Sequence, residues 1–146
     1  MPFREALAKL ALSDAARFER ETAETLRGIL ASCRDERLRR ALEEILAEEE
    51  AHCSAIRKEL ARRAPGKQPP QEERERLPRA PNATVSVSDD VCKALRRLLE
   101  KEEASATFYT LLAERTPIPA VRDVFLGIAA AERGHAAKLA ALARRL

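Results

Sequence analysis

The chain has 146 residues and a formal net charge of +3, with 27 basic residues against 24 acidic ones. This near balance and the 3% aromatic content argue against nucleic-acid binding, which usually needs a concentrated basic surface and aromatic stacking groups. No stretch has the roughly 18 apolar residues of a membrane span, and the first residues lack the pattern of a secretory signal. We therefore expect a cytoplasmic protein without nucleic-acid or membrane partners, with Cys33, Cys53 and Cys92 reduced.

Four segments carry apolar residues at helical spacing, in a sequence dominated by alanine, leucine, glutamate and arginine. The first two predicted helices run from about 4 to 31 and from about 35 to 63. A stretch with five of the chain's eight prolines follows and predicts a connection at about 64–87. The last two predicted helices run from about 88 to 114 and from about 119 to 145.

The lengths of the connections set the topology. Short links within 4–63 and within 88–145 predict two antiparallel helical hairpins. The link at about 64–87 can span ~80 Å when extended, which exceeds the ~40 Å length of such a helix. The sequence thus predicts an all-α, ferritin-like four-helix bundle, a single domain over 1–146, made of two repeated hairpins with one long crossover between the second and third helices. Ser88, followed by two aspartates, is a suitable N-cap for the third helix.

The two hairpins repeat one pattern at a constant offset along the chain. In both halves, a glutamate on the first helix precedes a Glu-x-x-His motif on the second helix by the same interval. The six residues, paired by this offset, are Glu19 with Glu102, Glu49 with Glu132, and His52 with His135. They include both histidines of the chain. A single Glu-x-x-His on a glutamate-rich helix is usually a solvated pair, whereas repetition of the whole set predicts one shared site.

All six side chains lie on the apolar stripes of their helices, where an unpaired charge is costly. Four buried carboxylates that face one another repel and resist ionisation unless a cation is present. Two divalent cations would balance the four negative charges. Carboxylate and imidazole ligands suit iron or manganese, whereas structural zinc sites usually use thiolates. The pattern therefore predicts a two-metal centre.

The sequence also supports expectations about several residues near these six. Tyr109, the only tyrosine, lies two turns after Glu102 on the same face, and it either packs in the core or hydrogen-bonds a group at the metal site. Cys53, beside His52, is expected to be a small core residue. Gly134 is expected to permit a close approach between helices. Five glutamates off the central stripe are expected to face solvent: Glu21, Glu24, Glu48, Glu50 and Glu103.

The arrangement resembles the ferritin-like di-iron carboxylate proteins, and most closely the rubrerythrin-type domain. The motifs that carry this resemblance are Glu19, AEEEAHC around Glu49 and His52, EKEEASATFY around Glu102, and AERGHA with Glu132 and His135. The resemblance implies two metal ions, an iron pair or else manganese or a mixed pair, that react with hydrogen peroxide or dioxygen. By this resemblance Glu49 and Glu132 would bridge the ions and Glu19 and Glu102 would be terminal ligands. His52 and His135 would each bind one ion.

The sequence also departs from that family. Rubrerythrins typically reduce peroxide with electrons relayed by a rubredoxin centre on paired CxxC motifs, and this chain contains no CxxC. Peroxidase activity would therefore need an external electron donor, such as a rubredoxin-type protein or a reductase. Leu98 and Leu99 occupy the inward positions one turn before Glu102, and Leu26 lies where the repeat places Tyr109. The resemblance further implies a homodimer.

Three other functions are compatible with the same pattern. One is ferrous oxidation for iron storage or transfer, which predicts a large hollow assembly. Another is oxygenation of an organic substrate, which needs a substrate pocket. The last is a metal-free helical bundle that serves as an interaction module, which predicts no bound metal.

Overall fold

The computed structural model describes residues 3–63, 68–82 and 90–145, and within these ranges it is helical and has no strands. The helices are α1 (Arg4–Ser32), α2 (Glu36–Ala61), α3 (Gln71–Glu75), α4 (Val91–Arg115) and α5 (Pro119–Ala143). The four long helices confirm the predicted segments to within a few residues. The short helix α3 lies inside the stretch that the prolines had predicted to be only a connection. None of the described helices is long and apolar enough to cross a membrane.

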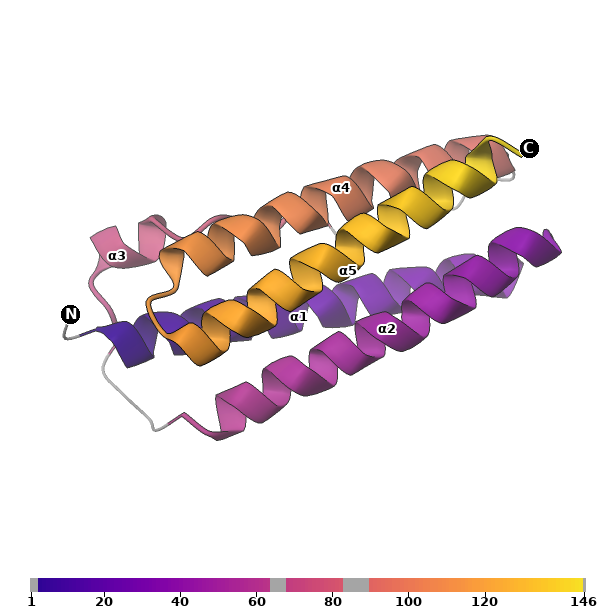
Figure 1. Cartoon of the computed structure of the whole chain (residues 1–146). Helices are drawn as coiled ribbons and strands as arrows, with labels where there is room; N and C mark the ends of the chain where they lie inside the picture. Colours follow the sequence, from indigo (N-terminus) through magenta and orange to yellow (C-terminus); the bar gives the residue numbers. More distant parts are fainter. Residues whose placement is uncertain (1–2, 64–67, 83–89, 146) are drawn as a thin grey trace.

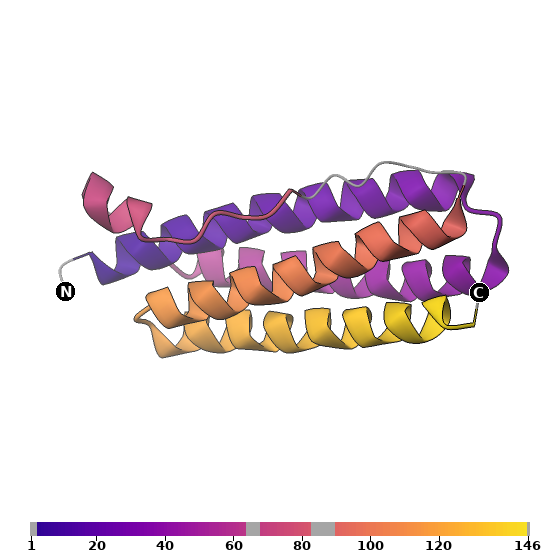
Figure 2. The same cartoon turned by 90° about the horizontal axis from the view of Figure 1, so that it is seen from above.

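The long helices form two antiparallel hairpins, α1 with α2 and α4 with α5, and the hairpins pack together into a bundle (Figure 1). The second helices of the two hairpins, α2 and α5, contact each other. Helix α2 ends near the N-terminal end of α1, whereas α4 begins at the opposite end of the bundle (Figure 1). The described part of the connection, residues 68–82, runs back along α1 (Figure 2). The predicted helical-bundle fold is therefore confirmed.

Aspartate side chains fix the starts of two long helices. Asp35 accepts a hydrogen bond from the backbone N–H of Leu38 at the start of α2. Asp90 accepts hydrogen bonds from the N–H groups of Cys92 and Lys93 at the start of α4. These caps satisfy donors that the first turn of a helix leaves unpaired. Because Asp90 caps α4, the helix begins after the predicted cap, Ser88, which lies outside the described residues.

The apolar core consists of two clusters along the bundle. The first, called here the Tyr109 cluster, includes Leu12, Phe18, Ile56, Tyr109, Leu112 and Phe125. The second, called the Leu42 cluster, includes Leu26, Leu42, Ile45, Leu98 and Leu139. On each long helix, the buried glutamate of the predicted site lies in the sequence between residues of one cluster and residues of the other. The fold thus brings four carboxylates to one level of the bundle, with apolar packing on both sides.

Leu112→Ala should test the core of the bundle. Leu112 is fully buried, so its truncation should lower the free energy of unfolding by about 2–5 kcal/mol. The neighbouring Leu111 is 41% exposed, and Leu111→Ala should change the stability by about 0.5 kcal/mol or less. Urea unfolding followed by circular dichroism would measure both variants. Equal effects at the two positions would contradict the described packing of α4.

Candidate metal centre

Each of the four long helices contributes one carboxylate to a cluster inside the bundle, and α2 and α5 each add a histidine one turn later. The four glutamates, Glu19, Glu49, Glu102 and Glu132, are at most 1% exposed. His135 is also buried, whereas the side chain of His52 is 15% exposed. The i, i+3 spacing places Glu and His of each motif on the same face of the helix. The structure thus brings together all six residues that the repeat had singled out.

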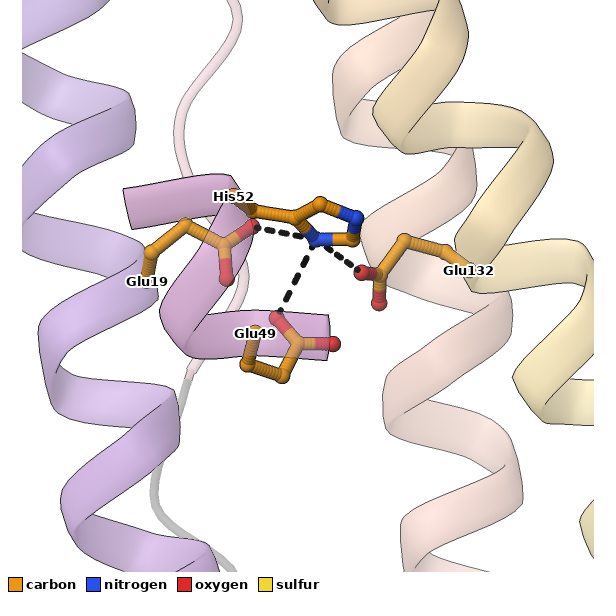
Figure 3. A group of neighbouring side chains, drawn as sticks. All are labelled: Glu19, Glu49, His52 and Glu132. Atoms are coloured by element: carbon orange, nitrogen blue, oxygen red, sulfur yellow. Dashed lines mark ion pairs between the residues drawn. The ribbon is translucent and has the colours of Figure 1, made fainter. Parts of the chain in front are cut away.

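The first group of potential ligands consists of Glu19, Glu49, His52 and Glu132 (Figure 3). The Nδ1 atom of His52 lies 3.5 Å from Oε1 of Glu132, 3.8 Å from Oε2 of Glu49 and 3.9 Å from Oε1 of Glu19. The carboxylates come from three different helices and converge on one imidazole nitrogen. One ligand atom from each of the four residues lies within 4.8 Å of the others. This spacing could accommodate one cation.

The second group consists of Glu49, Glu102, Glu132 and His135. The Nδ1 atom of His135 lies 3.3 Å from Oε1 of Glu49, 3.4 Å from Oε2 of Glu102 and 3.9 Å from Oε1 of Glu132. Glu49 and Glu132 therefore belong to both groups, whereas each of the other residues belongs to one. The two imidazole rings lie 6.3 Å apart, centroid to centroid. This arrangement suits two adjacent cations that share two carboxylates.

Unpartnered polar atoms support a cation at this cluster. Each of the six residues has a buried side-chain nitrogen or oxygen atom without a hydrogen-bond partner among the described residues. Such atoms are rare in folded proteins because burial without a partner is costly. Metal coordination would satisfy all of them at once. The residues present therefore fit a pair of metal ions held by carboxylates and imidazoles, a ligand set suited to iron or manganese.

The electrostatics of the cluster show how closely its charges interact. Burial and the neighbouring carboxylates raise the pKa of Glu19 and of Glu132, whereas close contacts with Glu19 and both histidines hold the pKa of Glu49 well below its usual range despite its burial. Burial opposes the charged form of His135, but close contacts with the carboxylates of Glu102, Glu49 and Glu48 outweigh it and raise the pKa of His135 to about 10. Protons therefore balance the negative charge in the metal-free protein, and a metal ion must displace them to bind.

Tyr109 both packs in the core and hydrogen-bonds a residue of the cluster. Its hydroxyl donates to Oε1 of Glu19 at 2.6 Å. Its ring contacts the rings of Phe18, Phe108 and Phe125. The two interpretations of Tyr109 that the sequence left open are therefore compatible. Burial and the charge of Glu19 raise the pKa of Tyr109, so its hydroxyl keeps its proton.

Two residues that contact or influence the cluster were missed by the sequence analysis. Glu48 was expected to face solvent, and its side chain is half exposed, yet its Oε2 lies 2.5 Å from Nε2 of His135. Lys101 is buried, and its Nζ lies 5.5 Å from the centroid of the Phe18 ring and has no hydrogen-bond partner among the described residues. Its charge acts on Glu19. No sequence signal identified Lys101, because a lysine among glutamates on a helix is usually solvated.

Two expectations about neighbouring residues are wrong. Gly134 is exposed, and a Cβ added there would meet no atom within 4 Å, so no close helix approach depends on it. Cys53 is only partly buried and lines a surface hollow between α1 and α2. Both errors have the same cause: Gly134 and Cys53 adjoin the inward-facing histidines in the sequence but lie toward the sides of their helices.

Fold and site together define a helical bundle that encloses a carboxylate–histidine cluster suited to two metal ions. Residues 93–146 match the family model described as Rubrerythrin. The matched region contains Glu102, Glu132 and His135, the second-half members of the repeated set. The rubrerythrin-type resemblance is thus confirmed for this part of the chain. No curated protein and no solved structure matches the sequence.

The metal-free protein should lose stability as the pH rises from about 7 to about 10. The folded chain has the raised pKa of His135, about 10, and raised pKa values for Glu19 and Glu132, so it binds more protons than the unfolded chain in this window. By linkage, the stabilisation from His135 is complete below its unfolded pKa near 6.5 and is lost as the pH approaches 10. Urea unfolding in EDTA at several pH values would measure this, and a rising stability would contradict it.

Tyr109→Phe should destabilise the metal-free protein by about 1–3 kcal/mol, because it leaves the buried Oε1 of Glu19 without its donor. Ser105→Ala is a matched control, since Ser105 is also buried on α4 but donates only to the backbone carbonyl of Lys101. Its cost should be about 1 kcal/mol or less. Urea unfolding would compare the two variants. A Tyr109→Phe variant as stable as the parent protein would show that the hydrogen bond to Glu19 contributes nothing.

Proposed function

We propose that the chain is a di-iron or iron–manganese carboxylate redox protein that reduces hydrogen peroxide or dioxygen with electrons from an external donor. The observation that carries this proposal is the sharing of Glu49 and Glu132 between two groups of ligand atoms. A single-metal site would need only one group. Two adjacent metal sites allow a two-electron reduction at one place, which is the requirement for cleaving an O–O bond.

Bound iron or manganese would supply the two electrons, and the overall reaction with peroxide is H₂O₂ + 2e⁻ + 2H⁺ → 2H₂O. In this proposal Glu49 and Glu132, which belong to both groups, would be shared by the two metal ions, and Glu19 and Glu102 would each help to hold one of them. Each histidine would contribute Nδ1, the ring atom that faces the carboxylates.

The chain's own residues would also control protons and water around the site. The hydroxyl of Tyr109 donates its proton in a hydrogen bond to Oε1 of Glu19, with 2.6 Å between the two oxygens, and would orient that carboxylate. The Tyr109 cluster and the Leu42 cluster exclude water above and below the carboxylates. In this low-polarity setting, charges and hydrogen bonds act more strongly than they do in water.

Access from solvent to the metal centre would come from the side of His52, the more exposed histidine. A hollow of about 430 Å³ lies between α1 and α2 next to this position, and Ala23 and Cys53 are among its lining residues. Four basic residues also line it, Arg20, Arg27, Arg57 and Lys58, with a single acidic residue, Glu50, which pairs with Arg27 at 2.8 Å. An electron donor with an acidic surface would be attracted to these charges. We therefore propose that the donor docks at this hollow.

Peroxide consumption by the iron-loaded protein with a chemical reductant would test the proposal. Glu49→Ala removes a carboxylate shared by both groups and should abolish turnover. The loss should exceed the roughly 10- to 100-fold loss that is typical when an outer partner of a ligand is removed. Glu43→Ala is a matched control on the same helix, because Glu43 is exposed and pairs with Arg39. It should retain both metal and turnover.

Elemental analysis should accompany this assay. A protein that carries two metal ions but shows no turnover with peroxide or dioxygen would overturn the proposed reaction. Light scattering would address iron storage, since a large hollow assembly would favour that alternative over a redox enzyme that acts as a homodimer.

A further inference from the structure

The two histidines of the cluster differ in what contacts the outer nitrogen of their rings. Nδ1 of His135 faces Glu49 and Glu102, and the opposite ring nitrogen, Nε2, contacts Oε2 of Glu48. For His52, every carboxylate contact among the described residues involves Nδ1. Glu48 lies on α2 and His135 on α5, so this contact joins the two hairpins.

The repeat has no second copy of this interaction. At the offset that pairs Glu49 with Glu132, the counterpart of Glu48 is Ala131, which has no acceptor to offer to the ring of His52. The six ligand residues follow the repeat, but the partner of the imidazole does not. The pseudo-symmetry of the site is therefore broken immediately outside the ligands.

A carboxylate at the outer nitrogen of a metal-binding histidine has a defined effect. It accepts the N–H of that nitrogen, which holds the ring in one tautomer and one orientation and leaves the lone pair of the other nitrogen directed at the metal. It also makes the imidazole a stronger ligand. His135 receives this support from Glu48, whereas His52 does not receive it from Ala131.

Two other differences also favour cation binding at the position of His135 over the position of His52. The side chain of His135 is 3% exposed and that of His52 is 15% exposed, so the His135 position is better shielded from competing water. The buried ammonium group of Lys101 acts on Glu19, which belongs only to the His52 group. A positive charge there disfavours a second cation nearby.

We propose that Glu48 is a positioning residue that makes the two metal positions unequal. The position formed by Glu49, Glu102, Glu132 and His135 binds a divalent cation more tightly and fills first. The position at Glu19 and His52 fills second. This inference rests on the proposed two-metal centre and adds an order of occupancy to it.

A titration with Zn²⁺, followed by NMR of ¹⁵N-labelled imidazoles, tests the order directly. Zn²⁺ is diamagnetic and binds carboxylate and imidazole ligands. The chain has only two histidines, so each ring can be followed separately. The first equivalent should shift Nδ1 of His135, and the second should shift Nδ1 of His52. This readout does not depend on catalytic activity.

Two variants test whether Glu48 sets the order. Glu48→Gln keeps the size of the side chain and removes its charge, and it should weaken the first binding step by about 10- to 100-fold. Ala131→Glu supplies the missing carboxylate on α5 and should tighten the second step, so that the two histidines respond together. Glu48 is half exposed and Ala131 is not fully buried, so neither change removes core packing.

Glu44→Gln is the matched control. Glu44 also lies on α2 and pairs across the same interface with Lys138 on α5, at 2.7 Å, but both side chains are exposed and neither belongs to the cluster. This variant should keep the order of occupancy. If His52 responds first, if both histidines respond together in the parent protein, or if Glu48→Gln behaves like Glu44→Gln, the inference is wrong.

Failure of the two-metal centre itself would give a different result. In that case neither imidazole would respond to Zn²⁺, and neither Fe²⁺ nor Mn²⁺ would raise the melting temperature of the protein. Such an outcome would overturn the proposed function, and the inference with it. A reversed or simultaneous response would overturn the inference alone.

Discussion

Repulsion among four buried carboxylates is the constraint around which the rest of the structure is organised. Each long helix brings one glutamate to the same level of the bundle, between two apolar clusters. In this setting the carboxylates cannot all be ionised without positive charge beside them. Protons supply it in the metal-free protein, where burial and neighbouring carboxylates raise the pKa of Glu19 and Glu132. Two divalent cations would supply it in the proposed holoprotein and would displace those protons.

The carboxylate–histidine cluster could be predicted from the sequence because its six residues follow the repeat. One constant offset pairs all six residues, and helical spacing alone predicts that they face inward. The predicted bounds of the four long helices were close to the observed ones, because apolar periodicity identifies the body of a helix well. The ends were less certain because they depend on single caps, and Asp90 rather than Ser88 caps α4. Helix α3 was missed because so short a helix does not show a period.

Residues around the ligands could not be predicted in this way. The contact of Glu48 with His135 depends on how α2 and α5 pack, and Glu48 has no counterpart in the second half. Lys101 was missed because its chemistry favours the surface, although it is buried against Phe18. Gly134 was misjudged because its position next to the motif histidine in the sequence did not indicate which side of the helix it occupies. Sequence periodicity specifies which way a side chain points, but not which neighbour it meets.

Three departures from the repeat lie just outside the six residues of the cluster. Tyr109 and Lys101 act on Glu19, on the side of the more exposed histidine, and Glu48 acts on the buried one. In the proposed two-metal centre, a symmetric set of six residues in asymmetric surroundings would give the two metal positions different charge, proton supply and solvent access. In the proposed enzyme, the buried position would retain its ion while substrate, protons and electrons arrive at the other. The counterparts of these three residues in the repeat are Leu26 for Tyr109, Phe18 for Lys101 and Ala131 for Glu48, none of which could take over the same role.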